Sequence, residues 1–536
     1  MSTQWKMSSY MKGAAMLTIS ALIIKILSAL YRVPFQNMVG DEGFYIYQQI
    51  YPFIGMITTW TSVGFAVALA KLMSDQMAKG DMEAVQKIKQ VGFTYISILS
   101  ILFFIAFLLG ADALAEAMGD AKLAPLLQIG AVVLLAMPFL AVLKSIYQTT
   151  ERLTPLAFAQ VIEQAVRVGF ILVGAYLVLN WTNDLYATGA VALLGASIGE
   201  AAGILLLGWW LTKKDRAILR KTSSSLSTKT ILRDLTWISV SASISSLFFL
   251  MMQLVDSMTV VNGLTAAGVD LQQAKETKGI YDRVQPLIQM GIVVTTSLAF
   301  ALVPLIASRS KQQDGRGAMP FIQLSYRVAL VFGSAAAAGL IATMPYVNET
   351  LFQTRDLSVV LMVGSGQVLW LSLILLFMAI LQGVGRIWRP TLWLVIGLIV
   401  KAISNVWLID SYGILGAAIA GNLAMVVALA GIVYEVKRQW KERLAGAAFY
   451  AGLALAVGAM SVSVVSIEVV LDAFLLDFLS SRLQSLMITA FSVPVGVVVF
   501  LILIMKRQLL RPKEWYLLPF GKRLAGVQLL LNRKKG

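Results

Sequence analysis

The sequence predicts an all-α membrane protein with about fourteen transmembrane helices, and three observations carry that prediction. Of its 536 residues, 58% are hydrophobic and only 13% are charged, whereas soluble domains are about one quarter charged. The hydrophobic residues form long blocks, many of them longer than the roughly 18 to 20 residues that cross a hydrocarbon core. The charged residues gather between these blocks. A soluble multidomain protein is therefore excluded.

Fourteen apolar blocks stand between polar breaks, and each is long enough for one spanning helix. In the first half they are 14–38, 45–69, 91–109, 123–143, 156–179 and 185–211. In the second half they are 238–261, 286–306, 321–344, 359–381, 391–409 and 415–436, followed by 445–469 and 486–505.

The distribution of basic residues orients these spans. With a cytoplasmic N-terminus, the inside segments hold 33 of the 44 lysines and arginines, the outside loops hold six, and five lie within spans. Basic residues concentrate in cytoplasmic loops of membrane proteins. A wrong number of spans would invert the pattern partway along the chain, and it does not invert. We expect a multi-pass protein of the cell membrane with both termini in the cytoplasm.

Several kinds of chemistry are excluded by composition. The sequence has no cysteine and no histidine, which excludes disulfides, thiolate nucleophiles, Cys/His zinc sites and Ser-His-Asp triads. It contains no P-loop motif that would bind ATP, and no large outside loop. We therefore expect a transporter and not an enzyme, without a metal or a bound cofactor. The net charge of +16 is explained by the cytoplasmic loops, so no nucleic-acid partner is expected.

Two basic segments stand out among the loops. Segment 212–234 carries seven basic residues and a Ser-rich stretch, and it is interpreted as a linker between two lobes, although an ordinary basic loop fits the same residues. The tail after residue 505 mixes basic residues with Trp515 and Tyr516. This composition predicts an amphipathic segment on the inner leaflet, in contact with anionic lipids; a disordered tail is the alternative.

An internal repeat relates the two halves of the chain. The aligned segments are 64–70 with 299–305, 55–59 with 291–296, and 141–144 with 379–382. The offset, about 235 residues, covers six helices, so both halves have the same topology and are related by an axis along the membrane normal. The predicted domains are a first six-helix lobe at 1–222, a second at 223–437, two extra helices in 438–505 and a basic tail at 506–536.

Ionisable residues within the spans are the candidate functional residues, because each costs about 2.5 to 3.5 kcal/mol at membrane depth and so faces a cavity or a partner. The basic ones are Lys25, Arg32, Arg167, Arg283 and Lys401, and the acidic ones are Glu163, Glu200 and Asp256. Five positive and three negative charges sum to +2, which predicts a cavity for an anion. The planar fork of arginine matches phosphate in particular.

Some of these residues have a second interpretation. Lys25 and Arg32 lie seven residues apart on one helical face, but Lys25 alone can also extend to the membrane surface. Arg283 fits an interfacial anchor as well as a binding residue. Glu163 and Arg167 have the i, i+4 spacing of an intrahelical ion pair.

The second span begins with the unusually polar and aromatic sequence YIYQQIYP at 45–52. We expect Gln48, Gln49 and Tyr51 to line the cavity and to bind sugar hydroxyls. Pro52 permits a bend for gating. An interfacial aromatic belt is the alternative, and it explains the tyrosines at the start of the stretch better than the glutamines.

The stretch SALYRVPFQNMVG at 28–40, followed by DEGFYIY at 41–47, resembles the opening helices of a known family. This is the polysaccharide-transporter branch of the multidrug/oligosaccharidyl-lipid/polysaccharide flippase superfamily. Also similar are YDR at 281–283 with Pro286, segment 160–167, and LQG at 381–383 before Arg389 and Pro390. The resemblance covers essentially the whole chain and extends to Gram-positive stage V sporulation protein B and the lipid II flippases.

The resemblance implies a fold and a set of roles. Two six-helix lobes would form an inverted V around the substrate, with alternating access, and the last two helices would line a groove for the lipid tail. Arg32 and Arg283 match the cavity cations that the family needs, and Lys25 matches less closely. The acidic position after the first helix corresponds to Asp41 or Glu42.

We therefore expect a flippase that moves an undecaprenyl-diphosphate-linked saccharide, such as lipid II or another cell-wall or polysaccharide precursor, to the outer leaflet. Its driving force is the membrane potential or a coupling cation, sodium or a proton, held by Glu200 or Asp256 with Glu163. Enzymes of wall synthesis are expected partners. The alternatives are a cation-coupled multidrug exporter of the same superfamily and a non-transporting scaffold of wall or spore-coat synthesis.

Overall fold

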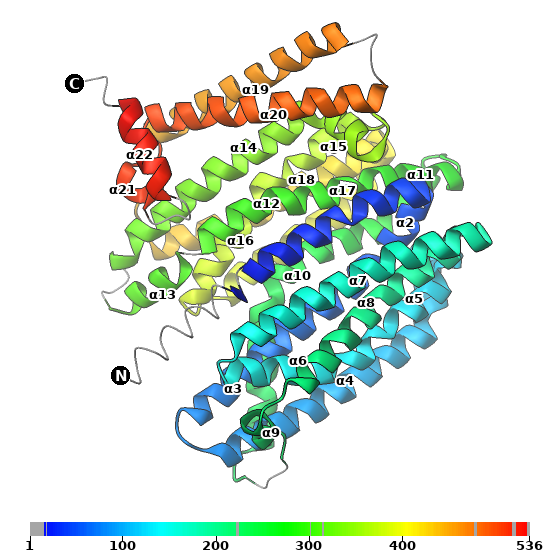
Figure 1. Ribbon diagram of the computed structural model, residues 1–536, viewed down its shortest axis with the longest axis vertical. Coiled ribbons are helices and arrows are strands. Elements are labelled where there is room, and N and C mark those ends of the chain that lie inside the picture. Colours follow the sequence, from blue (N-terminus) through cyan, green and yellow to red (C-terminus); the bar gives the residue numbers. More distant parts are fainter. Residues whose placement is uncertain are drawn as a thin grey trace. The chain divides into compact units, whose positions relative to one another are not determined.

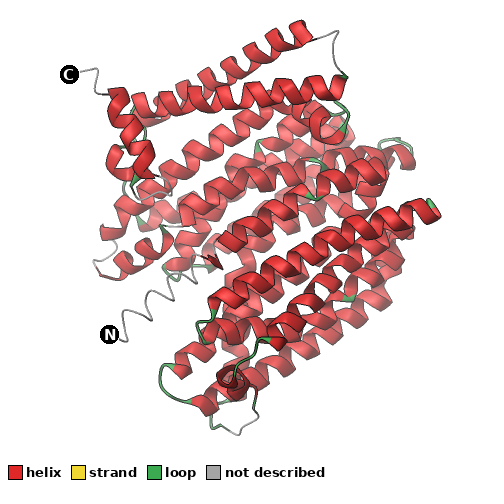
Figure 2. Cartoon of the chain, in the orientation of Figure 1, coloured by secondary structure: helices red, strands yellow, loops and turns green. Residues whose placement is uncertain are grey.

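The computed structural model describes residues 16–17, 19–220, 224–300, 302–312, 316–475, 480–516 and 521–532. Throughout these residues the regular structure is helical and contains no strand (Figure 2). The predicted all-α fold class is therefore confirmed. The chain divides into two compact units, Met1–Asp282 and Arg283–Gly536.

The first unit is a bundle of long helices (Figure 1). Helical residues 19–30 lead into α2 (Arg32–Thr59), and a π-helical turn (Trp60–Phe65) joins α2 to α3 (Ala66–Met77). The further helices are α4 (Met82–Ala117), α5 (Ala124–Ala131), α6 (Val133–Thr149), α7 (Leu153–Thr182), α8 (Leu185–Trp209), α9 (Lys213–Leu219), α10 (Thr228–Ala266) and α11 (Leu271–Asp282).

The chain reverses direction at Gly40, inside the segment assigned to α2. Gly40 has φ +71°, a left-handed conformation that glycine adopts without a steric penalty. The hydroxyl oxygens of Tyr31 and Tyr47, 16 residues apart, are separated by 2.8 Å, whereas 16 residues of straight helix advance about 24 Å. Residues before and after Gly40 therefore form a helical hairpin, which corresponds to the two expected spans 14–38 and 45–69.

Close packing of α7 on α8 fixes two of the candidate residues. The α8 face that meets α7 carries Gly195, Gly199 and Gly203, spaced by four residues as in small-residue packing motifs of membrane helices. A Cβ atom at Gly199 would lie 2.8 Å from the main-chain oxygen of Glu163 and 2.8 Å from Cβ of Arg167. The backbones approach this closely only because α8 has glycine there.

The second unit contains the remaining helices. They are α12 (Val284–Phe300), α13 (Val303–Gln312), α14 (Met319–Phe352), α15 (Ser358–Ser365), α16 (Gln367–Gly383), α17 (Trp388–Tyr412), α18 (Ile414–Gln439), α19 (Ala447–Leu475), α20 (Ser481–Lys506), α21 (Pro512–Trp515) and α22 (Gly521–Asn532). Helices α17 and α18 pack along each other, and the pair α19 and α20 packs against α14.

The expected count of fourteen spans is not confirmed. Among the described residues, twelve helical segments are long and apolar enough to cross a membrane. One of them, Ile19–Met77, contains the hairpin at Gly40 and so covers two expected spans. The expected span 286–306 is divided between α12, with 17 residues, and α13, with 10. These two differences account for the lower number.

The compact units do not follow the boundaries drawn from the repeat. Helices α10 and α11, which the repeat assigns to the second lobe, belong to the unit Met1–Asp282. The lobe boundaries at 222 and 437 therefore remain a prediction from the repeat. The linker at 212–234 contains α9, and its residues 221–223 lie outside the described part of the chain.

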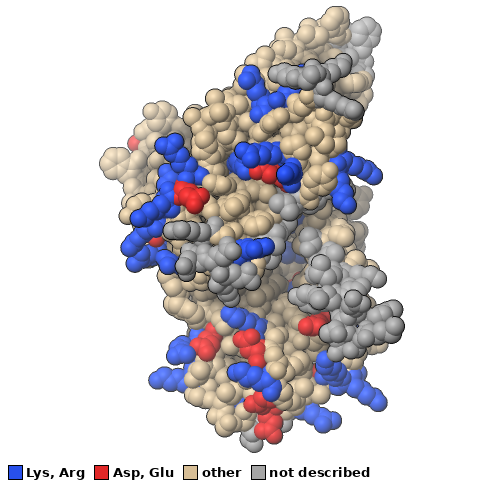
Figure 3. All heavy atoms as spheres, turned by 90° about the vertical axis from the view of Figure 1, so that its left-hand side faces the viewer, with Lys and Arg blue, Asp and Glu red and all other residues tan. Residues whose placement is uncertain are grey.

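The tail folds back onto the end of α20. The side-chain amide of Gln528 donates to the carbonyl of Leu510 at 2.9 Å, and Arg327 forms an ion pair with Glu514. Trp515, expected at the membrane surface, is buried against α20 and α22, and its position relative to the membrane stays a prediction. Residues 517–520 and 533–536 of the expected tail lie outside the described residues. Exposed Lys522 and Arg523 still provide positive charge on α22, and basic side chains are spread widely over the face in Figure 3.

The short helix α9 is held by one buried carboxylate. Asp215 accepts hydrogen bonds from the main-chain nitrogen and the hydroxyl of Thr212 at 2.8 and 2.7 Å, and it pairs with Arg152. Burial opposes the charged form, but the hydrogen bonds from Thr212 and the charge of Arg152 outweigh it and lower the pKa of Asp215. A lowered pKa adds stability above the ordinary carboxyl pKa and loses it as the pH falls through the folded value.

We predict that Asp215→Asn increases hydrogen exchange of the α9 amides by about tenfold at neutral pH, because it removes charge-assisted hydrogen bonds of about 1.5 kcal/mol or more. In the parent protein, lowering the pH through the pKa of Asp215 also lowers the protection factors of the α9 amides. The measurement is hydrogen exchange by mass spectrometry over residues 213–219.

The matched control is Asp234→Asn, because Asp234 pairs with Arg233 where both side chains are exposed. Such a surface pair contributes about 1 kcal/mol or less, so this variant keeps the α9 protection of the parent. Equal protection of α9 in Asp215→Asn and the parent would contradict the role of the buried carboxylate.

Candidate functional site

The hairpin at Gly40 encloses an arginine between aromatic rings. Arg32 is 0% exposed, and its guanidinium carbon lies 4.3 Å from the ring centroid of Tyr51 and 6.0 Å from that of Tyr31. Within the described residues, its Nε and both Nη atoms are buried without a hydrogen-bond partner. Ring faces attract a guanidinium but accept none of its hydrogen bonds in the plane. The arginine is therefore held in place between aromatic rings.

A second arginine from α7 joins this group. Arg167 interacts electrostatically with Tyr31, Tyr47 and Tyr51, so the two arginines share three tyrosines, which we call the tyrosine cluster. The Nε atom of Arg167 has no hydrogen-bond partner in the described part of the chain, and its side chain is partly exposed. The structure thus brings together two of the predicted binding cations, Arg32 and Arg167.

An acidic residue in the surroundings of Arg32 is already paired. Asp282 at the end of α11 lies within electrostatic reach of Arg32. Its carboxylate, however, binds the ammonium group of Lys278 at 2.5 Å, one turn earlier on the same helix. The positive charge of the arginines is therefore not neutralised by a direct ion pair with Asp282.

The glutamines of α2 have a structural role in addition to any in binding. The side-chain amide of Gln49 donates to the carbonyl of Ser257 in α10 at 3.1 Å, and this side chain is buried. The side-chain oxygens of Gln48 and Gln49 are buried and accept no hydrogen bond from the described residues. Gln49 therefore connects α2 with α10. Pro52 lies within α2, which remains helical there.

A second charged group lies where α6, α7 and α8 meet. Glu163 pairs with Lys144 of α6 at 3.0 Å, and Lys144 also donates to Ser62 at 2.9 Å. The expected pairing of Glu163 with Arg167 is therefore wrong, because Arg167 turns to the tyrosine cluster. Lys144 was missed because the expected span 123–143 ends one residue before it.

Glu200 of α8 is a buried carboxylate in this second group. It is 3% exposed, and neither carboxylate oxygen has a hydrogen-bond partner among the described residues. Its electrostatic neighbours are Glu163, Lys144 and Arg167. Arg167 therefore belongs to the surroundings of both Glu200 and the tyrosine cluster. An ionised, unbonded carboxylate is unfavourable at this depth, so the position suits a group that binds a proton or a cation.

The acidic residues near the Gly40 turn differ in their contacts. Asp41 accepts a hydrogen bond from Gln36 at 2.8 Å, and Gly279 of α11 packs so closely that an added Cβ would lie 2.0 Å from the main-chain oxygen of Asp41. Glu42 is half-buried. Asp256 accepts from the hydroxyl of Tyr281 at 3.3 Å.

Another network joins α11 to the rest of the first unit, and sequence reasoning missed it. Asp120 forms an ion pair with Lys275 at 2.9 Å and accepts from the hydroxyl of Tyr186 at 2.6 Å. Lys275 also donates to Tyr186 at 2.9 Å. Asp120 and Lys275 lie between the expected spans, and Tyr186 lies at the start of the expected span 185–211. Their partners are too distant in sequence for a local pattern to reveal them.

Each of the other predicted cations is described by its own surroundings. Arg283 of the second unit is 0% exposed and donates from Nη1 to Asn348 at 3.0 Å and to Thr354 at 2.9 Å. This environment does not fit a simple interfacial anchor. Lys401 of α17 is buried and donates to the carbonyl of Ala417 at 2.9 Å. Lys25 lies exposed on the helix that precedes α2.

The second unit also contains an apolar cavity of about 430 Å³ between α12, α14, α19 and α20. Its walls include Met290, Phe332, Leu340, Met460, Val497 and Phe500. The two C-terminal helices beyond the repeat therefore contribute one side of a lipid-compatible cavity.

Comparison with known proteins identifies relatives along the full chain. The chain is 35% identical to the uncharacterised membrane protein YabM of Bacillus subtilis over 96% of both chains. It is 27% identical to stage V sporulation protein B of the same organism, over 78% of this chain and 82% of that one. It is 24% identical to the B. subtilis lipid II flippase MurJ, over 80% of this chain and 83% of that one.

Solved structures show the same fold. The inward closed conformation of the lipid II flippase MurJ matches with a TM-score of 0.65 at 13% identity, covering 92% of this chain and 98% of that chain. An inward-facing multidrug transporter of the same superfamily matches with a TM-score of 0.58 at 16% identity, covering 79% and 98%. The fold is thus that of these transporters.

The family of polysaccharide biosynthesis proteins matches residues 10–310, more than half of the chain. The relatives are flippases and transporters and not enzymes. The chain therefore belongs to the polysaccharide biosynthesis protein family and is a multi-pass membrane transporter of the flippase type.

Proposed function

We propose that the chain is a flippase for an undecaprenyl-diphosphate-linked saccharide, with lipid II as the first candidate cargo. It would move this cargo from the cytoplasmic to the outer leaflet by alternating access. The observation that carries the proposal is the pair Arg32 and Arg167 around the tyrosine cluster, in a chain of the flippase family.

The arrangement of the two arginines suits a diphosphate. The guanidinium carbon of Arg32 lies over the ring of Tyr51, and the N–H groups of a guanidinium bind anionic oxygens in its plane. Two planar forks match the two phosphates of the cargo better than two ammonium groups would. A low-dielectric environment strengthens this attraction compared with water. We propose Arg283, Lys25 and Lys401 as further cations that bind the cargo.

The apolar cavity of the second unit suits the other end of the cargo. Its walls are aliphatic and aromatic side chains of α12, α14, α19 and α20, and each buried methylene of a polyprenyl chain contributes about 0.8 kcal/mol. The tail would rest there or in the adjoining lipid while the head group moves. Solved multidrug transporters share the fold, but a pair of arginines suits an anion and not a cationic drug.

Transport in one direction also needs an affinity for the anion that changes during the cycle. We propose that a proton on Glu200 supplies this change. An ionised Glu200 attracts Arg167, its electrostatic neighbour, and weakens the hold of Arg167 on phosphate. A protonated Glu200 leaves Arg167 to the cargo, while Glu163 stays paired with Lys144. Sodium at this group and the membrane potential are the other candidate driving forces.

The cargo is tested by complementation in cells depleted of their own lipid II flippase. We predict rescue by the parent protein and loss of rescue by Arg32→Ala and Arg283→Ala at matched membrane abundance. Removal of one charge-assisted phosphate contact lowers affinity by about tenfold or more. Growth and lipid II accumulation are the measurements.

The control for complementation is Arg233→Ala, because the side chain of Arg233 is exposed near the start of α10. We expect this variant to rescue growth like the parent protein. Failure of the well-expressed parent would exclude lipid II and favour another lipid-linked saccharide. Rescue by both cavity variants would contradict the assignment of these arginines to the cargo.

The driving force is tested with the parent and Glu200→Gln in proteoliposomes that hold a fluorescent lipid-linked diphosphate saccharide. We predict that a pH gradient accelerates translocation by the parent and has no effect on Glu200→Gln, since glutamine binds no proton. The exposed acidic position Glu442 provides the matched control Glu442→Gln, which keeps the response of the parent. An unchanged response in Glu200→Gln would contradict proton binding at this residue.

A further inference from the structure

A buried carboxylate in the second unit has no role in the proposed transport path. Glu468 of α19 is 3% exposed in a helix long and apolar enough to cross a membrane. Its one hydrogen bond within the described residues comes from the hydroxyl of Ser492 in α20, at 3.3 Å to Oε1. No lysine or arginine of the described chain forms an ion pair with it. A carboxylate kept at such a position needs a cation or a proton.

Glu468 lines a cavity of about 530 Å³ that is separate from the apolar cavity described above. The two cavities share no lining residue. Helices α14, α15 and α19 form the walls, which include Ile341, Pro345, Tyr346, Met362, Val465 and Glu468. Apart from the tyrosine and the carboxylate, these named walls are apolar. The cavity is therefore suited to an alkyl chain that carries one polar group.

The wall next to Glu468 adds features that favour a positive group. Tyr346 contributes an aromatic ring, which attracts ammonium groups. Pro345 has no N–H, so the carbonyl of Ile341, four residues earlier on the same cavity wall, lacks its helical hydrogen bond. A carboxylate, an aromatic ring and a spare carbonyl oxygen are all electron-rich. A phosphate at this place would be repelled.

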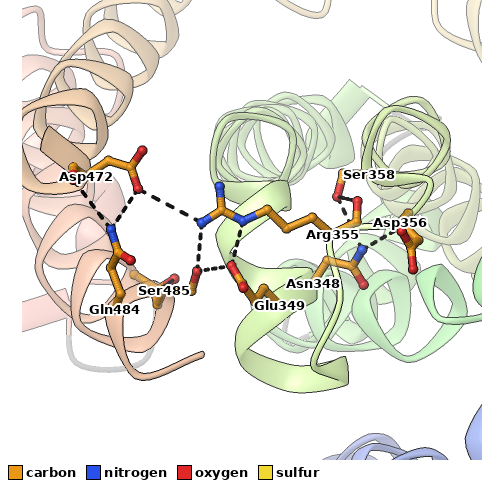
Figure 4. Close-up of polar contacts among 9 residues, drawn as sticks. Asn348, Glu349, Arg355, Asp356, Ser358, Asp472, Gln484 and Ser485 are labelled. Atoms are coloured by element: carbon orange, nitrogen blue, oxygen red, sulfur yellow. Dashed lines mark hydrogen bonds and ion pairs between the residues drawn. The ribbon is translucent and has the colours of Figure 1, made fainter. Parts of the chain in front are cut away.

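Arg355, which lies beside the cavity wall, is committed to other acidic groups. Arg355 lies over the ring of Tyr346, with its guanidinium carbon 4.7 Å from the centroid. Its Nε binds Glu349 at 2.6 Å, and its terminal nitrogen reaches Ser485 at 3.3 Å and Asp472 at 4.0 Å (Figure 4). This cluster ties the α19–α20 hairpin to α14 and holds the wall of the cavity in place. It does not supply a counter-charge to Glu468.

We propose that this cavity binds the ammonium group of a cationic amphiphile, with Glu468 as its counter-ion and the ring of Tyr346 as part of the wall beside it. The alkyl chain extends along the apolar walls toward lipid. The ligand thus has the opposite charge to the proposed cargo and a separate cavity. The inference does not depend on which saccharide the chain carries.

The test is direct binding of radiolabelled dodecyltrimethylammonium to the full-length protein in nanodiscs. We expect saturable binding to the parent and binding at least about tenfold weaker in Glu468→Gln, which removes the charge but keeps the size of the side chain. Tyr346→Leu removes the ring and weakens binding by about fivefold. The exposed-site variant Glu442→Gln binds like the parent. An uncharged dodecyl glycoside does not compete.

Two results would overturn the proposal. One is equal affinity of the parent and Glu468→Gln, and the other is competition by the uncharged glycoside as strong as by unlabelled cation. Either would mean that the cavity accepts alkyl chains without regard to charge. Glu468→Gln is expected to fold, since it replaces a buried charge with a neutral group of similar volume, and its melting temperature checks this.

Nanodisc composition distinguishes two sources of the ammonium group. If phosphatidylethanolamine occupies the cavity, its ammonium group competes with the probe. The difference in probe affinity between the parent and Glu468→Gln is then smaller in discs that contain this lipid than in discs of phosphatidylglycerol, a lipid of equal chain length without an ammonium group. If the natural ligand is a phosphate-free amphiphile, that difference is equal in both. In both cases Glu468→Gln binds the probe more weakly than the parent.

Discussion

The reversal of the chain at Gly40 places Arg32 among aromatic rings, and the candidate anion site depends on it. Without the positive φ of Gly40, Arg32 and Tyr51 would lie far apart along one helix instead of 4.3 Å apart. A residue with a Cβ atom pays about 1 to 2 kcal/mol for such a conformation. Gly279 of α11 covers the turn at a distance that only glycine allows. Two glycines thus permit the geometry that holds an arginine between aromatic rings.

The buried charges of the described chain fall into groups with different physical consequences. Direct ion pairs are Lys144–Glu163, Lys275–Asp120 and Lys278–Asp282. These pairs neutralise one another and connect helices, or turns of one helix, so they do not by themselves indicate a ligand. Arg32, Glu200 and Glu468 are different, because none of them forms a direct ion pair within the described residues. Burial of such a charged group is favourable only when a bound ligand, or for a carboxylate a proton, compensates its charge.

The fold class could be predicted from the sequence, because a long apolar block that crosses a membrane has few possible structures other than a helix. It also identified Arg32, Arg167 and Glu200 as unusual, since intramembrane charges are visible without any structure. It did not reveal which charges meet. The i, i+4 spacing suggested an ion pair between Glu163 and Arg167, but in the structure Glu163 pairs with Lys144 of a neighbouring helix. Glu468 escaped notice because it lies one residue before the end of an expected span, where a charge is unremarkable.

Translocation by the purified protein is the most direct test of an anion-binding flippase. The parent and Arg32→Ala are reconstituted in proteoliposomes with a fluorescent undecaprenyl-diphosphate saccharide, and a membrane-impermeant reagent reports which leaflet holds the head group. We predict exchange between leaflets by the parent and a rate at least about tenfold lower in Arg32→Ala. Equal rates in the two proteins, or no exchange by the folded parent, would contradict the account.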